Sequence, residues 1–264
     1  MKQPNKIWGQ ASATLSPSSL SALRLKYVLS DLKSVEGKVL EVGCGAGMFA
    51  IAIKKALPSL EVYGTDLNKE AIKKALKNSS GVNFKYGDVM KLPYKDKIFD
   101  AVVSFDVLEH LEDPSAALSE ISRVLKKGGL LHIFVPIEGD LLTLPGILRK
   151  LGYLPKIKYA GHIQQYKRDE FKNYLRKAGF KINRVFYSSH LFMQIIDSVY
   201  FLIISLTKIE IDNTIEGYIS KGNKNIWINI LNLAKSSIAT LSYFESSLLK
   251  NLPGQGMHSS CKKT

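Results

Sequence analysis

The sequence predicts an α/β fold in which helices cover a largely parallel sheet. Short apolar runs rich in β-branched residues alternate with helix-like stretches between Lys38 and Pro136. Glycines, prolines and polar residues separate these stretches. The chain has 264 residues, of which 45% are hydrophobic, so it can enclose a full α/β domain and still carry insertions.

The expected elements follow one another in regular order within this core. The expected strands are KVLEVG, LEVYGTD, VNFKYGD, FDAVVSFD and LLHIFVP, and the expected helices are MFAIAIKKAL, NKEAIKKALKN and DPSAALSEISRVLKKGG. Asn68 and Asp113 are the expected N-caps of the second and third helices. Pro114 falls in the first turn of the third helix, and Gly128 follows its expected end.

The remaining segments are expected to decorate the core and divide the chain into six parts. These are an N-terminal helical cap (1–37), the ligand-binding core (38–136), an irregular, basic substrate cap (137–167), a core continuation with one helix and one strand (168–190), a helical insertion (191–250) and a last strand (251–264).

The chain carries a formal net charge of +14, of which +9 lies in residues 151–264. This excess suits an anionic partner, such as a phosphorylated substrate, nucleic acid or lipid head groups, and equally suits a lysine-rich soluble surface. Two cysteines give neither a disulfide framework nor a metal-binding spacing, so a cytoplasmic location is expected. The first residues do not resemble a signal peptide, and the most apolar run, 191–206, is short for a membrane span.

The stretch LEVGCGAG places Gly43, Gly45 and Gly47 between the first expected strand and helix. Glycine accepts positive φ and lets a ligand approach the backbone, while the N–H groups of the helix face that ligand. A GxGxxG fingerprint would require glycine at the position of Met48, and no Lys-Ser/Thr pair follows as in a P-loop. The turn therefore predicts a ligand other than a dinucleotide pyrophosphate.

Acidic residues lie at or near the ends of four expected strands: Glu41, Asp66, Asp88 and Asp106. Because open parallel sheets bind ligands at the carboxyl ends of their strands, these side chains are expected to share one edge. Asp66 is placed to accept hydrogen bonds from ribose hydroxyls, and Asp88 from an adenine amino group. The alternative is that each acid only caps a helix or a turn.

Residues 38–136 resemble the core of the class I S-adenosylmethionine-dependent methyltransferases, within the broad small-molecule group that includes quinone-biosynthesis enzymes. The resemblance rests on VLEVGCGAG, YGTDLN, the stretch from YGDVMKLP to LLHIFVP, and the later RDEFKNYLRKAGF. It implies a Rossmann-like seven-stranded sheet with helices on both faces and an antiparallel last strand. FKINRVFYSS and GMHSSCKKT would then be the sixth and seventh strands.

The resemblance also implies S-adenosyl-L-methionine as the cofactor, and a set of residues that hold it. Glu41 with Gly43, Gly45 and Gly47 would hold the methionine end, Asp66 the ribose, Leu67 and Asp88 the adenine with the Val89 N–H nearby, and the backbone of Ser104 and Phe105 would face the sulfonium.

Transfer of an activated methyl group requires mainly that the acceptor is held in line with it and that water is excluded. A hydroxyl acceptor also benefits from a general base. His162 in AGHIQQY is the candidate base because it lies in the expected substrate cap; the alternative is a surface or backbone-bonded histidine. His110 is expected to position the loop after the fourth strand, His132 is expected in the core, and no metal is expected.

The acceptor is expected to be a small, lipid- or glycan-linked molecule, with O-methylation favoured. In residues 191–250, apolar helices either pack on the core and on each other or contact an anionic membrane surface at its inner face. The second helix places these apolar residues at helical spacing: Trp227, Ile230, Leu231, Ala234, Ile238 and Leu241.

Three other functions compete with this interpretation. An RNA methyltransferase suits the positive charge, but the sequence contains no recognisable RNA-binding module, so nucleic acid is disfavoured. Met48 and Asp88 argue against a nicotinamide-dependent oxidoreductase. A non-catalytic binding protein with the same fold is the third alternative.

Overall fold

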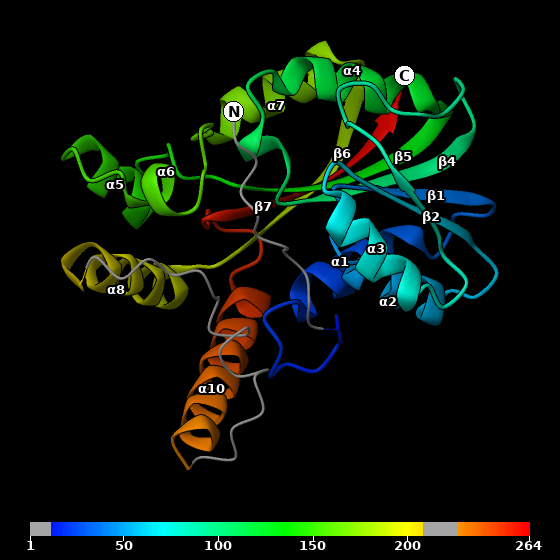
Figure 1. Ribbon diagram of the computed structural model, residues 1–264. Helices are drawn as coiled ribbons and strands as arrows, with labels where there is room; N and C mark the ends of the chain where they lie inside the picture. The colour runs from blue at the N-terminus through cyan, green and yellow to red at the C-terminus, as the bar shows by residue number, and fades with distance from the viewer. Residues whose placement is uncertain (1–11, 208–225) are drawn as a thin grey trace.

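The computed structural model describes residues 12–207 and 226–264. A seven-stranded sheet in the order β3-β2-β1-β4-β5-β7-β6 forms the centre of the molecule (Figure 1). The strands are β1 (Lys38–Val42), β2 (Glu61–Asp66), β3 (Asn83–Tyr86), β4 (Phe99–Phe105), β5 (Leu125–Pro136), β6 (Phe180–Ser188) and β7 (Gly256–Lys263). Strands β1 to β5 pair in parallel, and β7 is antiparallel to β5 and β6. The predicted Rossmann-like fold with an antiparallel last strand is confirmed.

Helices cover both faces of the sheet (Figure 1). One face carries α1 (Ala22–Leu32), α2 (Met48–Ala56) and α3 (Lys69–Lys77), and the other carries α4 (Pro114–Val124) and α7 (Arg168–Lys177). Val28 and Ile53 are fully buried on the first face, and Ile121 and Phe171 on the second. Burial of such side chains contributes about 1.5–3 kcal/mol each.

The helix starts follow the capping residues that the sequence contains. The Asn68 side chain accepts hydrogen bonds from the N–H groups of Glu70 and Ala71, and Asp113 accepts one from Ala116. Helix α4 ends at Val124, earlier than the expected end just before Gly128, because Leu125 already pairs with Phe99 at the start of β5.

Residues 137–167 were expected to be irregular, and this expectation is wrong for two short stretches. They form α5 (Leu144–Lys150) and α6 (Pro155–Tyr159). The Thr143 hydroxyl accepts a hydrogen bond from the Gly146 N–H, and a proline stands in the first turn of each helix. Backbone N–H groups in the first turn of a helix have no intrahelical acceptor, so proline, which lacks an N–H, removes no hydrogen bond there.

The chain between β6 and β7 forms a separate insertion that contains α8 (Leu191–Thr207) and α10 (Ile226–Leu248). Ser188 at the end of β6 pairs with Gly256 at the start of β7, so the insertion leaves and rejoins the sheet at neighbouring positions. Helix α8 packs against α5, α6 and α10, and α10 extends away from the sheet (Figure 1). Among the described helices, none combines the length and apolarity needed to cross a bilayer.

The two inserted helices turn apolar side chains toward solvent. On α10, Ala234 and Leu241 of the predicted apolar stripe are exposed and Ile238 is half-buried. Trp227, Ile230 and Leu231 lie outside the part of the chain whose side chains are described. The buried face of α10 is formed by small or polar residues, namely Ala239, Ser242 and Ser246. For the described part of α10, the apolar stripe predicted from the sequence therefore lies on the solvent-facing side of the helix, and not on the side that packs against the protein.

Candidate functional site

The glycine turn adopts the positive-φ backbone that its sequence predicts. Gly43, Gly45 and Gly47 have φ angles of 68°, 54° and 86°. A Cβ atom on Gly47 would lie 2.4 Å from Cζ of Phe84 on β3, so a side chain there would collide with the core. The turn thus brings backbone, rather than side chains, to the carboxyl ends of β1 to β4, which we call the β1–β4 edge.

Glu41 is fully buried beneath the turn. Its Oε2 atom accepts a 2.6 Å hydrogen bond from the N–H of Ala50, the third residue of α2. Burial, with a smaller contribution from the nearby Asp66 carboxylate, raises the pKa of Glu41 well above its ordinary value. Glu41 therefore holds α2 to β1 and shapes the turn through that helix.

Asp66 binds the turn directly. Its Oδ2 atom accepts a 2.8 Å hydrogen bond from the Gly45 N–H, and its Oδ1 atom accepts a 2.7 Å bond from the Asn68 N–H. An ionised carboxylate offers about four acceptor sites, so each oxygen retains capacity for a ligand hydroxyl. The neighbouring Leu67 is exposed at the same edge, where an apolar ring can lie against it.

The other predicted cofactor residues lie at the end of β4 or just after the end of β3, at this same edge. Asp88 accepts a 2.8 Å hydrogen bond from the Met90 N–H, and Val89 is buried. Ser104 is fully buried, and its hydroxyl has no hydrogen-bond partner within the described part of the chain. Phe105 stacks on Phe49 of α2 with ring centroids 4.3 Å apart.

His162 lies beside the ends of β4 and β5, next to this edge. Its Nδ1 atom is 3.0 Å from Oε2 of Glu138, which follows β5 directly. The cap backbone at Gln165 passes close to Gly139, where a Cβ atom would lie 2.3 Å from the Gln165 backbone oxygen, so only glycine fits at this position. The Gly139 N–H instead donates to the Tyr166 carbonyl, which fixes the cap segment over β5.

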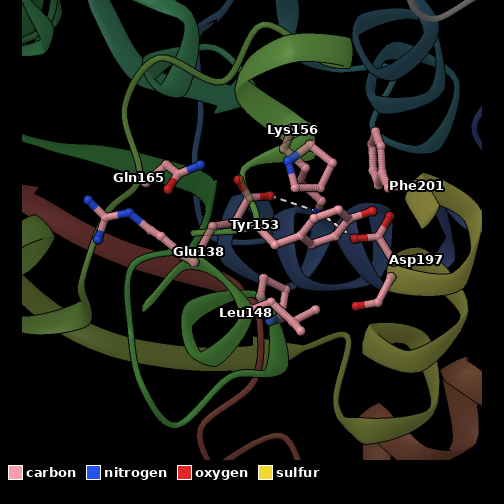
Figure 2. Close-up of a pocket in the computed structure, with 11 residues that line it drawn as sticks. Glu138, Leu148, Tyr153, Lys156, Gln165, Asp197 and Phe201 are labelled. Atoms are coloured by element: carbon pink, nitrogen blue, oxygen red, sulfur yellow. Dashed lines mark ion pairs between the residues drawn. The ribbon is translucent and has the colours of Figure 1, made fainter. Parts of the chain in front are cut away.

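Glu138 belongs to a buried chain of charges that the sequence analysis missed. Lys156 Nζ of α6 lies 2.7 Å from Oε1 of Glu138 and 2.5 Å from Oδ2 of Asp197 on α8 (Figure 2). Burial alone would raise the pKa of Glu138, but Lys156 and His162 hold it at about 2. The position of Glu138 after β5 was its one available signal, since it follows the same strand-end rule as Asp66.

Glu109 and His110 stand on η1 (Leu108–His110), directly after β4, and face His162. The His110 and His162 rings are 5.0 Å apart, and Nδ1 of His110 is 3.0 Å from the Gly161 carbonyl. Glu109 is fully buried, and neither carboxylate oxygen finds a hydrogen-bond partner among the residues described. Burial, followed by the nearby Asp106 carboxylate, raises the pKa of Glu109, whereas burial and His162 lower that of His110.

Within the described part of the chain, Glu109, His110 and His162 also form a group that could hold a cation. One potential ligand atom from each of Glu109, His110 and His162 lies within 4.8 Å of the others. The buried Glu109 carboxyl, whose pKa is raised, does not require a cation at this place.

Comparison with known proteins gives the same assignment as the fold and the turn. The family model described as "Methyltransferase domain" matches residues 40–133. An uncharacterized methyltransferase of Schizosaccharomyces pombe is 37% identical over 145 residues, covering 51% of this chain and 49% of that protein. The demethylmenaquinone methyltransferase of Staphylococcus carnosus is 33% identical over 181 residues, covering 59% of this chain and 73% of that protein.

Among solved structures, the cyclase SpnF shares the fold. Its TM-score is 0.60 at 20% identity, with 97% of this chain and 83% of that chain covered. The chain spans about half the length of the S. pombe relative.

The chain belongs to the class I S-adenosylmethionine-dependent methyltransferases. The family cofactor is S-adenosyl-L-methionine, and the β1–β4 edge suits it. The glycine turn presents its backbone at this edge, and the Asp66 carboxylate beside it can accept further hydroxyl groups.

Proposed function

We propose that the protein transfers the methyl group of S-adenosyl-L-methionine to a hydroxyl group of a small, lipid- or glycan-linked acceptor. The observation that carries this proposal is the His162–Glu138 pair beside the β1–β4 edge. A histidine whose Nδ1 is held by a carboxylate is suited to take a proton at Nε2, and a hydroxyl acceptor is the class that gains most from such a base.

In this proposal the cofactor lies along the β1–β4 edge. The Gly43–Gly47 backbone holds the methionine end and Glu41 supports it from below. Asp66 accepts from the ribose, Leu67, Asp88 and Val89 surround the adenine, and the Ser104–Phe105 backbone faces the sulfonium. The bound cofactor supplies a methyl group to the acceptor oxygen while the electrons of the broken C–S bond return to sulfur. The acceptor proton moves to Nε2 of His162, and the cap excludes water.

The surface near this site supports an amphipathic acceptor. Exposed apolar residues form one stripe along α8, at intervals of three or four: Leu191, Ile195, Val199, Leu202 and Leu206. On α10, Leu241, Phe244 and Leu248 are 56%, 61% and 84% exposed. Such contiguous apolar surface is characteristic of a contact with lipid or with another apolar partner.

Basic residues accompany this apolar surface. Residues 141–168 contain six lysines and arginines and no acid. Lys156 and Arg168 are largely buried in ion pairs, and the other four are exposed: Arg149, Lys150, Lys158 and Lys167. Helices α5 and α6 pack directly on α8. Apolar helices beside basic side chains bind anionic lipid interfaces. We propose that the insertion rests on the inner face of the cytoplasmic membrane, where a lipid-linked acceptor is available.

Methyl transfer from labelled cofactor into cell fractions tests the acceptor class. Purified protein is incubated with methyl-labelled S-adenosylmethionine and, separately, with a lipid extract, a polar metabolite extract and total RNA. We expect label in the lipid extract, as an alkali-stable methyl ether. Label confined to RNA would replace this proposal with an RNA methyltransferase.

The His162→Ala variant tests the base. Loss of a general base is expected to lower turnover about 10²–10⁴-fold, with cofactor affinity unchanged by calorimetry. The same assay on native protein treated with a metal chelator distinguishes catalysis by a His162 base from catalysis that depends on a bound cation. Activity that is lost with a chelator and restored by a divalent metal would assign Glu109, His110 and His162 a different role.

A role other than methyl transfer is the second candidate, because a neighbour of the same fold is described as a [4+2]-cyclase. Cofactor binding without label transfer into any of the three fractions would favour it.

A further inference from the structure

We propose that Glu138 is a positioning residue for His162, and that Lys156 and Asp197 fix Glu138, so that the inserted helix α8 completes the active site. This inference rests on the proposed function of His162 as the base. Its observation is the unbroken contact series Asp197–Lys156–Glu138–His162, which joins α8, α6, the end of β5 and the cap segment. Figure 2 shows Lys156 between the two carboxylates.

The contacts determine which nitrogen of His162 carries the proton. Glu138 is ionised at neutral pH because its pKa lies at about 2, so its Oε2 atom can only accept. The neutral His162 ring must then hold its proton at Nδ1, which leaves the lone pair at Nε2 free for the acceptor hydroxyl. The tautomer that can act as a base is therefore selected by Glu138.

Charge balance supports the same role. Lys156 is one cation between two carboxylates, and its side chain is only 12% exposed while that of Glu138 is 2% exposed. The three groups together carry one excess negative charge. A proton taken up by His162 neutralises this charge within the buried cluster, so the imidazolium formed during transfer is stabilised.

Other elements place few ionised groups against His162. Lys156 faces it through Glu138, and the Asp106 carboxylate is paired with Arg24 of α1 at 3.1 Å. The charged and titratable groups around His162 are thus Glu138, Lys156, Asp197, Glu109, His110 and the Asp106–Arg24 pair. Of these, Glu138 is the one whose ionised oxygen touches the ring.

Glu138→Gln is the informative substitution. Lys156 Nζ lies 2.7 Å from Oε1 of Glu138 in the native protein, so it is expected to attract the amide oxygen and to turn the amide NH₂ toward Nδ1 of His162. That arrangement stabilises the wrong tautomer, with the proton at Nε2. We expect kcat to fall at least about 100-fold, with the KM for S-adenosylmethionine unchanged. The acidic limb of the kcat/KM profile should move to lower pH, because an amide does not stabilise the imidazolium.

Long-range ¹⁵N–¹H spectra of the imidazole rings read the tautomer without any acceptor. The native protein should show His162 protonated at Nδ1, and Glu138→Gln should show it protonated at Nε2. Asp197→Asn should change kcat about threefold to tenfold in the same direction, because Lys156 then has one anionic partner in place of two. An unchanged His162 tautomer in Glu138→Gln would overturn the inference.

The matched control is Asp31→Asn. Asp31 and His132 form another buried carboxylate–imidazole pair, 2.7 Å apart, between α1 and β5, and Asp31 also pairs with Arg184 of β6. We expect this variant to lose stability but to keep its kcat and pH profile. A double-mutant cycle completes the test: Glu138→Gln should have no further effect on turnover in a His162→Ala background. Additive losses would indicate a merely structural Glu138, whereas a His162→Ala variant with full turnover would refute the proposed function itself.

Discussion

The β1–β4 edge and the cap region differ in how their polar groups are held. At the edge, Glu41, Asp66 and Asp88 each accept hydrogen bonds from backbone N–H groups within 21 residues of them in the chain. In the cap, Glu138, Lys156 and Asp197 hold one another through side chains from three separate elements. The edge is therefore built by local chain geometry, and the cap by tertiary packing.

If the cap holds the acceptor, as proposed, this contrast separates the two binding sites. Backbone contacts tolerate changes in neighbouring side chains, so the edge can stay constant while the surrounding protein varies. Side-chain networks depend on every member, so a substitution in the cap region should alter the proposed acceptor site and leave the proposed cofactor site intact.

Gly47→Ala should give the largest effect, and it should disrupt the β1–β4 edge without changing the cap region. The new Cβ meets the Phe84 ring at 2.4 Å in a backbone with φ of 86°, so the turn must shift. We expect the Kd for S-adenosylmethionine, measured by calorimetry, to rise at least about 100-fold. Gly128→Ala is the control: φ is 72°, yet no atom of the described chain lies within 4 Å of the added Cβ. Equal affinity losses in the two variants would contradict a specific role for the turn.

Asp66→Asn should weaken the edge less. The amide keeps one acceptor oxygen but turns an NH₂ group toward either the Gly45 or the Asn68 N–H. Hydrogen bonds to a charged group contribute about 1.5–3 kcal/mol, so cofactor affinity should fall about tenfold to a hundredfold. The thermal midpoint of the ligand-free variant provides the control for folding. Unchanged affinity would show that Asp66 does not touch the cofactor.

Leu241→Ser with Phe244→Ser should affect only the insertion. Both side chains are exposed, so the fold keeps its packing while the apolar surface shrinks. Co-sedimentation with phosphatidylglycerol vesicles at low salt should fall about tenfold, with cofactor affinity unchanged. Leu76→Ser, on the exposed face of α3, is the matched control. Vesicle binding that is absent in the native protein would remove the membrane contact from the proposal.

Glu109→Gln should give the smallest effect, visible in stability against pH. The raised pKa of Glu109 means that its contribution to stability is present below the ordinary value of 4.5 and is lost as pH rises above it. Between pH 4.5 and 5.5 the native protein should lose about 1 kcal/mol through this group, and the variant should not. Urea unfolding at the two pH values measures this, with the exposed Glu112→Gln as the control.

The fold could be predicted because its signals are local. Asn68 and Asp113 cap the helices where the sequence places them, and the alternation of periods marks every strand of the parallel region. The helices α5 and α6 escaped prediction because each is a short turn begun by a proline, without a full apolar period. On α10, periodicity revealed a stripe but not which side would be covered, since that depends on the packing of α8.

The site divides in the same way. The acids of the β1–β4 edge could be placed together from strand ends alone, because parallel strands bring those ends to one edge. His162 was singled out by its position in the cap. Its partners were not, because Glu138 and Asp197 are 59 positions apart in the sequence and only the folded chain joins them through Lys156.

The pairing of Ser188 with Gly256 has a consequence for how this enzyme family can diversify. A segment that starts and finishes at adjacent sheet positions can be exchanged between relatives by recombination without disturbing the strands on either side. Here the exchanged piece would carry both the apolar stripe of α8 and Asp197. Transplanting residues 189–255 into a relative would therefore move the proposed membrane contact together with Asp197, the outer support of the Glu138–His162 pair, as one heritable unit.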